Sequence, residues 1–316
     1  MVVARILVVA IIGLLCSSSF ASALSWYATE YMFVFGDSYT TDGYNVSAGI
    51  NSPVPGYTSS NGQNWVQFLT STYNQTAVKT FDLAYGGATI DGALVPPYQP
   101  TVLSVVDQVA QFNEYLASRP AGATWSSTNS LFAVWIGIND IGNSVGWTNI
   151  TRVEFYGTLM DRLFSQVEDL YSKGARSFLF LTVPPTNRAP LFLQQGPEAA
   201  VQMRTDITEY NTQLIQSVRT FKSKHPDLDT VTMVDTQPIF NVLLDEWQTF
   251  GFVNVTGYCT AYENGTPTPT DQVEGCAPVS SYFWLNSLHP LFTVHNILAK
   301  AISTALSGYP ATQIPT

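Results

Sequence analysis

The sequence predicts an α/β fold, a three-layer α/β/α sandwich in which a central parallel sheet of about five strands lies between two layers of helices. Two observations support this prediction. Five short β-rich runs recur along the chain, and each is apolar almost throughout, as strands covered on both faces are. Segments with helical periodicity separate these runs, and strands that alternate with helices form parallel sheets.

The expected strands are bounded by turn residues on both sides. They cover Met32–Phe35, Thr80–Ala84, Leu131–Ile136, Phe178–Val183 and Val231–Val234. Right-handed crossovers bring the carboxyl ends of parallel strands to one edge of the sheet. Sites in open α/β sheets lie at that edge, so we expect a site there.

The expected helices are marked by apolar residues at helical spacing. The first three carry Trp65, Phe68 and Leu69, then Val105, Val109, Phe112 and Leu116, then Leu159, Leu163, Val167 and Leu170. Gly174 is placed to end the third. Two more are expected over Glu198–Lys222 and Pro290–Leu306, where Pro290 can take the first helical position.

The first 23 residues are predicted to be a secretory signal peptide. One charge at Arg5 precedes an apolar run over Ile6–Leu15, and small residues at Ala21 and Ala23 precede a cleavage position. The run is too short to span about 30 Å of hydrocarbon comfortably. We therefore expect an exported protein, with residues 24–316 forming a single domain because no linker-like stretch divides them.

The charge of the chain excludes some classes of partner. The formal net charge is −10, and Lys and Arg form no cluster. Such a chain should repel nucleic acid and anionic membranes, so we expect neither nucleic-acid binding nor stable membrane association. No residues have metal-ligand spacing or form a phosphate-binding loop, so neither a metal nor another cofactor is expected. A monomer is expected.

The cysteines and the Asn-X-Ser/Thr sequons fit an exported protein. Cys16 leaves with the signal peptide, and the remaining pair, Cys259 and Cys276, is expected to form a disulfide in an oxidising compartment. Five sequons are candidate glycosylation sites: Asn45, Asn74, Asn149, Asn254 and Asn264.

The ends of the first three predicted strands carry small and polar residues. They are Gly36-Asp37-Ser38, Ala84-Tyr85-Gly86-Gly87-Ala88 and Gly137-Ile138-Asn139-Asp140, and His289 follows late in the chain. Each motif alone is typical of an ordinary turn, and a lone histidine is typically structural. Together they supply a hydrolase's parts: Ser38 as nucleophile, His289 as its base, and an oxyanion hole from the N–H groups of Ser38 and Gly87 and the Asn139 amide.

The same blocks, in this order, resemble the GDSL or SGNH hydrolase superfamily. The sequence FGDSYT is followed by Gly-Gly-Ala, Gly-X-Asn-Asp and Ser-Leu-His-Pro, so the resemblance extends from Phe35 to His289. Within it, the chain is most similar to secreted fungal acetylesterases of carbohydrate esterase family 16. The resemblance implies a flavodoxin-like α/β/α fold, metal-independent ester hydrolysis, and a functional set of Ser38, Gly87, Asn139 and His289.

One position departs from the superfamily pattern. An aspartate usually stands three residues before the histidine, and here that residue is Asn286. Three interpretations remain open. Asn286 orients His289 more weakly through its amide oxygen, a backbone carbonyl or another carboxylate does so, or the protein is inactive. We favour an active Ser38–His289 dyad assisted by Asn286 or a backbone carbonyl.

Three aromatic residues and two histidines have expected roles outside the dyad and the oxyanion hole. Aromatic residues near the motifs, Trp135, Trp284 and Tyr85, are expected to bind an acetylated saccharide substrate, such as a hemicellulose fragment. His225 is expected to be solvated and His295 to be structural. The alternatives are a general short-chain esterase or lipase that acts on lipid-like esters, and a non-catalytic carbohydrate-binding homologue.

Overall fold

A computed structural model describes residues 26–308, and the predicted signal peptide lies outside the described residues. Five parallel strands form one sheet in the order β2-β1-β3-β4-β5. This is the strand order of flavodoxin-like folds, and it reverses between β1 and β3. The strands are β1 (Tyr31–Gly36), β2 (Lys79–Asp82), β3 (Ser130–Trp135), β4 (Ser177–Leu181) and β5 (Thr230–Val234). The predicted fold class and all five predicted strands are confirmed.

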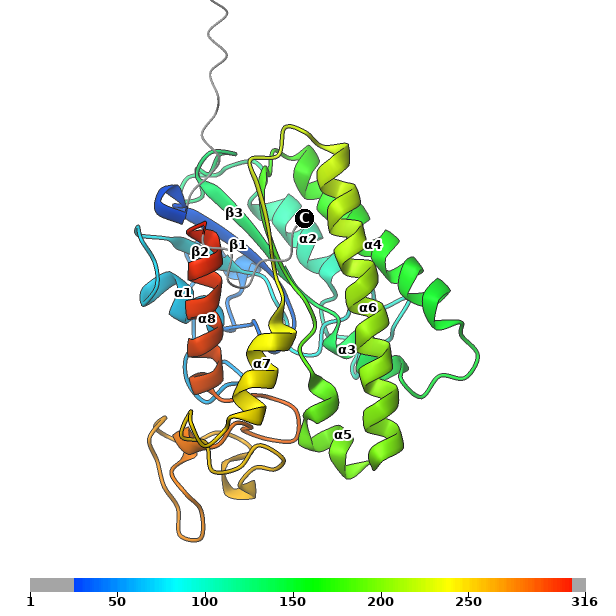
Figure 1. Ribbon diagram of the computed structural model, residues 1–316. Coiled ribbons are helices and arrows are strands. Elements are labelled where there is room, and N and C mark those ends of the chain that lie inside the picture. The colour runs from blue at the N-terminus through cyan, green and yellow to red at the C-terminus, as the bar shows by residue number, and fades with distance from the viewer. Residues whose placement is uncertain (1–25, 309–316) are drawn as a thin grey trace, which may run out of the picture.

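Two helical layers cover the sheet (Figure 1). One contains α1 (Trp65–Ser71), α7 (Thr236–Asp245) and α8 (Phe292–Leu306); the other contains α2 (Val105–Tyr115), α4 (Arg152–Ser172) and α6 (Pro197–Lys224), with the short α3 (Ile138–Ser144) and α5 (Pro190–Gln194) against α6. Single 3-10 turns lie at Trp26–Ala28, Val46–Ala48, Thr186–Arg188, Thr260–Tyr262 and Val279–Ser281. Both layers bury apolar side chains against the sheet, so every residue of β3 and β4 is buried.

Local signals set the helix ends. Asn64 and Ser104 begin α1 and α2 with capping boxes. In each, the cap side chain accepts a hydrogen bond from the backbone N–H of the third helical residue, and the side chain of that residue accepts one from the backbone N–H of the cap. Gly174, at φ +109°, follows α4 as expected. The expected start of the last helix at Pro290 is wrong. Pro290 pairs with Trp284 in an isolated antiparallel bridge, and α8 begins at Phe292.

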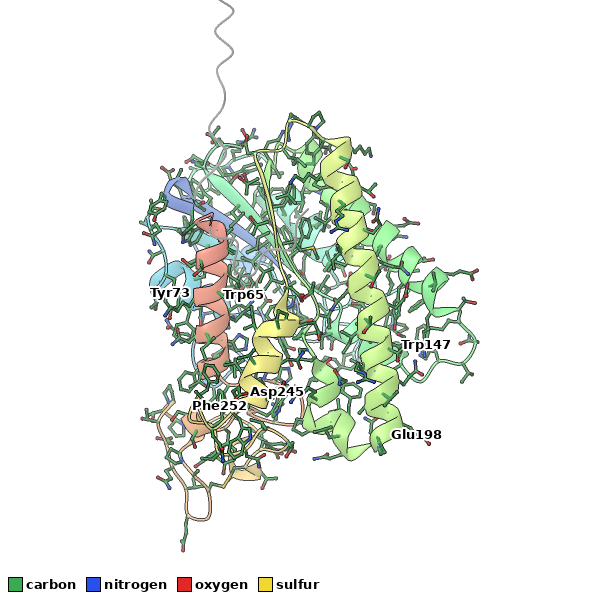
Figure 2. The ribbon with its side chains drawn as sticks, in the orientation of Figure 1. Trp65, Tyr73, Trp147, Glu198, Asp245 and Phe252 are labelled. Carbon is green, nitrogen blue, oxygen red and sulfur yellow. A yellow bond between two sulfur atoms is a disulfide. The ribbon has the colours of Figure 1, made fainter. Side chains whose placement is uncertain are left out.

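A long excursion separates α7 from α8. Residues 246–291 contain two 3-10 turns and two isolated bridges, and they form the orange lobe below both helices in Figure 1. The lobe has its own small apolar cluster, made by Cys259, Tyr262, Val279, Tyr282, Leu285 and Leu291. The expected disulfide between Cys259 and Cys276 is present in this lobe. The main aromatic core is continuous and extends into this lobe: Trp65 and the lobe residue Phe252, labelled in Figure 2, are both buried in it.

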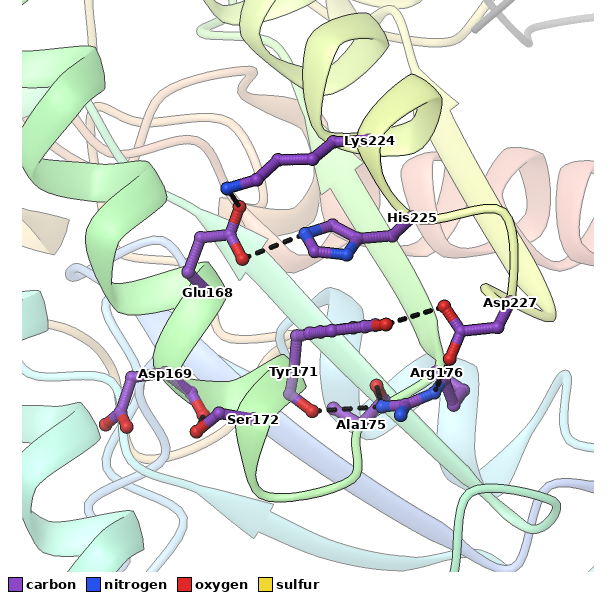
Figure 3. A network of polar contacts seen from close by, with 9 residues as sticks. All are labelled: Glu168, Asp169, Tyr171, Ser172, Ala175, Arg176, Lys224, His225 and Asp227. Carbon is purple, nitrogen blue, oxygen red and sulfur yellow. Dashed lines mark hydrogen bonds and ion pairs between the residues drawn. The ribbon is translucent and has the colours of Figure 1, made fainter.

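A polar network lies at the amino edge of the sheet, where the chain enters β4 and β5 (Figure 3). His225 Nε2 lies 2.8 Å from Glu168 Oε2, and its ring stacks on Tyr171 with centroids 3.9 Å apart. The Arg176 guanidinium lies over the same tyrosine ring, 4.1 Å from its centroid, and pairs with Asp227. The expectation that His225 is merely solvated is therefore wrong, because this network holds its ring.

Candidate active site

Three strand ends and one late loop meet at the carboxyl edge of the sheet. Ser38 follows β1, Gly87 follows β2, and Asn139 lies in the first turn of α3 after β3. Residues 286–289 approach from the end of the orange lobe, just before α8. The site thus lies where the strand order reverses, which is the position that the fold favours.

The turn after β1 presents Ser38. A Cβ on Gly36 would lie 2.6 Å from the Trp135 carbonyl oxygen, so only glycine allows this close approach of β1 to β3. The next side chain, Asp37, is buried, and its Oδ1 accepts a hydrogen bond from the Tyr39 N–H at 2.9 Å. Asp37 thus braces this turn, and Ser38 is left half-buried with its hydroxyl toward His289.

Gln108 supports the same turn from α2, and sequence reasoning missed it. Its side chain is fully buried, and it pairs with Gly36 in both directions: Gly36 N–H donates to Oε1 and Nε2 donates to the Gly36 carbonyl, each at 2.9 Å. A buried amide bonded in this way fixes the backbone two residues before Ser38. In the sequence, Gln108 lies at helical spacing from Val105 and Phe112. It therefore could not be told apart from an ordinary buried position of that helix.

Ser38, His289 and Asn286 form a continuous hydrogen-bonded relay. The Ser38 hydroxyl lies 2.8 Å from His289 Nε2, and Asn286 Oδ1 lies 3.0 Å from His289 Nδ1. Both distances lie in the range needed for proton transfer and orientation. The residues are thus arranged as a nucleophile, a base and an acceptor behind the base.

The orientation of the Asn286 amide is set by the backbone. Its Oδ1 also accepts from the N–H groups of Leu288, at 3.1 Å, and His289, at 3.0 Å, while Nδ2 faces the Glu263 carbonyl at 3.4 Å. Turning the amide over would point its NH₂ at two backbone donors. The oxygen therefore faces Nδ1, which must carry the imidazole proton, and this leaves the lone pair of Nε2 for Ser38.

Tyr39 ties the serine turn to the histidine loop. Its hydroxyl donates to the Leu288 carbonyl at 2.5 Å, and its ring lies 5.7 Å from that of His289, centroid to centroid. The tyrosine ring is buried against Trp135. Tyr39, which follows Ser38, thereby holds Leu288, which precedes His289.

Burial controls the ionisation of the site. It lowers the pKa of His289 to about 4, so the imidazole is neutral and able to accept a proton at neutral pH. Burial also raises the pKa of the Asp37 and Asp140 carboxyls to about 7. His295, confirmed as structural, is buried in α8, accepts from the Trp65 N–H at 3.3 Å, and has its pKa lowered to about 3 by burial and by His289.

The expected oxyanion-hole groups face the same edge. Gly87 adopts φ +82°, and Asn139 Nδ2 donates to the Ala88 carbonyl at 2.9 Å, which links the two predicted donors. Within residues 26–308, the backbone N–H groups of Ser38 and Gly87 have no protein acceptor. Two backbone donors and one amide are thus available to a developing oxyanion.

The aromatic candidates divide into buried and exposed residues. Trp135 and Trp284 are each 1% exposed, and their indole N–H groups donate to the carbonyls of Thr182 and Val255. The expectation that these two tryptophans bind substrate is wrong, because both are core residues with satisfied donors. Tyr85 is 39% exposed and lines a cleft, as described below.

Two clefts lie near these strand ends, and of the two only the first is lined by relay residues. The first, of about 430 Å³, is lined by His289, Asn286, Tyr57 and residues of the disulfide lobe, including Glu263. The second, of about 510 Å³, is lined by Tyr85, Gly86, Thr41 and again Tyr57. Both have the size of ligand sites.

The five Asn-X-Ser/Thr sequons differ in how far they are exposed. Asn45, Asn149 and Asn264 are exposed, and Asn74 and Asn254 are half-buried, so all five sequons have some exposed surface and their glycosylation stays a prediction. Over the described residues, no three His, Cys, Asp or Glu side chains are arranged to hold a metal ion. No helix in that range is long and apolar enough to cross a membrane.

Comparison with known proteins gives a consistent result. The GDSL-like Lipase/Acylhydrolase family matches residues 32–302. An acetylesterase from Thermothelomyces thermophilus is 36% identical over 290 residues, 89% of each chain, and one from Hypocrea jecorina is 25% identical, covering 88% of this chain and 89% of that one. An acetyl xylan esterase variant from Geobacillus stearothermophilus has a solved structure with a TM-score of 0.48 and 17% identity over 91% of this chain and 97% of that one.

The match includes the serine turn, both later strand ends and the histidine loop, so it spans every residue of the relay described above. The chain therefore belongs to the GDSL-like lipase and acylhydrolase family and is a carboxylic ester hydrolase.

Proposed function

We propose that this protein is a secreted esterase that releases acetyl groups from acetylated carbohydrates through an acyl-enzyme on Ser38. The single observation that carries the proposal is the relay of Ser38, His289 and Asn286, because it prepares the serine for attack. Similarity to acetylesterases supports acetate as the acyl group. The predicted signal peptide, together with the disulfide, supports export.

The reaction follows from the positions of the protons. Ser38 Oγ attacks the ester carbonyl while His289 Nε2 takes its proton, and the imidazolium that forms is held by Asn286 Oδ1 through Nδ1–H. The N–H groups of Ser38 and Gly87 and the Asn139 amide would stabilise the oxyanion. His289 then protonates the sugar oxygen as its bond to the acetyl carbon breaks, so that the sugar leaves as an alcohol. Water, deprotonated by the same nitrogen, attacks the acetyl carbon, and acetate leaves as Ser38 Oγ takes the proton back.

The nature of the cleft walls favours a carbohydrate over a lipid-like ester. Both clefts are rich in hydroxyl and amide side chains, such as Ser59 and Asn264 in the first and Ser47 and Gln111 in the second. These groups can pair with sugar hydroxyls, whereas an acyl chain of a lipid needs an extended apolar wall.

The test is hydrolysis of aryl esters of increasing chain length by the wild type and by Ser38→Ala. We expect the acetate to be the best substrate and Ser38→Ala to lose nearly all turnover with an unchanged circular dichroism spectrum. Ser38→Ala that keeps most of the turnover would reject the nucleophile. A preference for long acyl chains would favour the lipid-like alternative, and absence of any hydrolysis by the wild type would favour the non-catalytic one.

A further inference from the structure

Tyr57 stands between the two clefts and is common to both. It is 77% exposed, on the loop that precedes α1, and it is one wall of the 430 Å³ cleft and one wall of the 510 Å³ cleft. A tyrosine this exposed contributes little to the core, so packing of the protein does not explain it.

The two clefts are lined by different residues of the candidate site and its neighbours. The first contains His289, the base. The second contains Gly86, the neighbour of the oxyanion donor Gly87, and Thr41, whose N–H is bonded to the Asp37 carbonyl of the serine turn at 3.0 Å. Tyr57 is therefore shared by the cleft that contains His289 and by a cleft next to the Ser38 and Gly87 turns.

The backbone of Tyr57 is anchored beside Gly43, although most of the side chain is free. Its backbone N–H donates to the Asp42 carbonyl at 2.9 Å. Gly43, at φ +83°, passes beneath it, since a Cβ at that position would lie 3.3 Å from both Cβ and Cδ2 of Tyr57. An exposed flat ring carried on an anchored backbone offers a large contact area to a ligand.

We propose that Tyr57 is a specificity-determining residue that packs against a sugar ring next to the acetylated one, so that the enzyme prefers acetylated oligosaccharides to acetylated monosaccharides. The apolar face of a pyranose suits the flat tyrosine ring, and the hydroxyl and amide groups on both sides of Tyr57 suit the neighbouring sugars. The inference rests on the proposed carbohydrate esterase function and adds the length of the substrate.

The experiment compares three probes: monoacetylated xylotetraose, a monoacetylated methyl xyloside, and an aryl acetate. The protein is produced in a bacterial periplasm. There the disulfide can form, and Asn45 and Asn264, which line the clefts, carry no N-glycan. We expect the wild type to have a higher kcat/KM on the tetraose than on the xyloside. Tyr57→Ala should lower the ratio of tetraose to aryl acetate kcat/KM about tenfold, mainly through KM, which corresponds to about 1.4 kcal/mol.

Two matched variants complete the design. Tyr57→Phe should keep most of the tetraose preference because the ring remains. Tyr27→Ala removes another exposed tyrosine, 58% exposed and on a distant surface, and should leave all three substrates unaffected. Equal wild-type kcat/KM on tetraose and xyloside, or a Tyr57→Ala loss as large on the aryl acetate as on the tetraose, would overturn the proposal. A wild type that hydrolyses aryl acetate but no acetylated sugar would instead reject the proposed function.

Discussion

Asn286→Asp adds a charge beside His289 and keeps the size of the side chain, so it isolates the electrostatic part of that residue's role. In the wild type a neutral amide accepts the His289 Nδ1–H at 3.0 Å, and burial lowers the pKa of the imidazole to about 4. A carboxylate at the same distance favours the imidazolium and should raise this pKa by about one to three units. The base must be neutral to act, so activity is present above the pKa and lost as the pH falls through it.

The size of the effect can be worked from that shift. With a wild-type pKa of about 4, roughly nine tenths of the His289 side chains are neutral at pH 5. If the variant pKa is two units higher, only about one tenth are neutral. Asn286→Asp should therefore be about tenfold less active than the wild type at pH 5 and comparable to it near pH 8.

Asn286→Ala is the matched control, because it removes all three hydrogen bonds accepted by Oδ1 without adding charge. It should lower kcat by about 10² to 10⁴ at every pH, since the ring loses its orientation and its fixed tautomer. The assay is kcat/KM for an aryl acetate from pH 3.5 to 8, with circular dichroism to verify folding. Asp37→Asn is run alongside, because the Asp37 carboxyl has its pKa raised to about 7 and would add its own limb to the profile.

Two outcomes would refute this reasoning. An acid limb near pH 6.5 that is present in the wild type and persists in Asp37→Asn would show that burial does not control the pKa of His289. An Asn286→Ala loss smaller than about tenfold would show that another group orients the ring.

Three further predictions concern other parts of the fold. Gly87→Ala should lower kcat by about 10²-fold, because a φ of +82° strains any other residue and displaces the N–H proposed to bind the oxyanion. The added Cβ would also lie 2.2 Å from Cε1 of the exposed Tyr98, so full recovery in the double variant with Tyr98→Ala would contradict the backbone explanation. Replacing Cys259 and Cys276 by serine should lower the free energy of unfolding by about 3 kcal/mol in chemical denaturation, since the bond joins residues 17 apart, and an unchanged midpoint would contradict this. His225→Ala should lower Tm and leave kcat unchanged, because its network lies at the opposite edge of the sheet; a lower kcat at unchanged Tm would count against that separation.

Strands and motif residues were the predictable part of this protein. Each strand is an apolar run bounded by turn residues, and these local signals located all five to within two residues at either end. The polar residues at strand ends predicted where Ser38 and Asn139 lie, because parallel strands leave little freedom in the position of their carboxyl ends. The acceptor behind His289 could not be predicted, since the choice between Asn286 and a backbone carbonyl depends on loop geometry.

The less predictable part depends on tertiary packing. Trp135 and Trp284 are adjacent to motifs in sequence, but large aromatic residues also make up much of the core. Adjacency in sequence does not show whether a ring points into the core or toward the site. Tyr57 carries no motif and lies in a loop, so only the two clefts single it out. The lobe over residues 246–291 lacks periodicity, and its shape depends on a small cluster and a disulfide.

The hydrogen bond between Ser38 and His289 joins residues 251 positions apart. Activity that depends on it therefore indicates that the whole domain has folded. The proposed nucleophile and oxyanion donors lie on the first half of the chain, while the proposed base lies in the loop before α8, after all five strands of the described residues in the sequence. Contacts of such long sequence separation form late, because the loop they close costs entropy that only a packed core offsets. During refolding, esterase activity should therefore return only with docking of α8, later than the helical signal, and a nascent chain should stay inactive until its last helix has been synthesised.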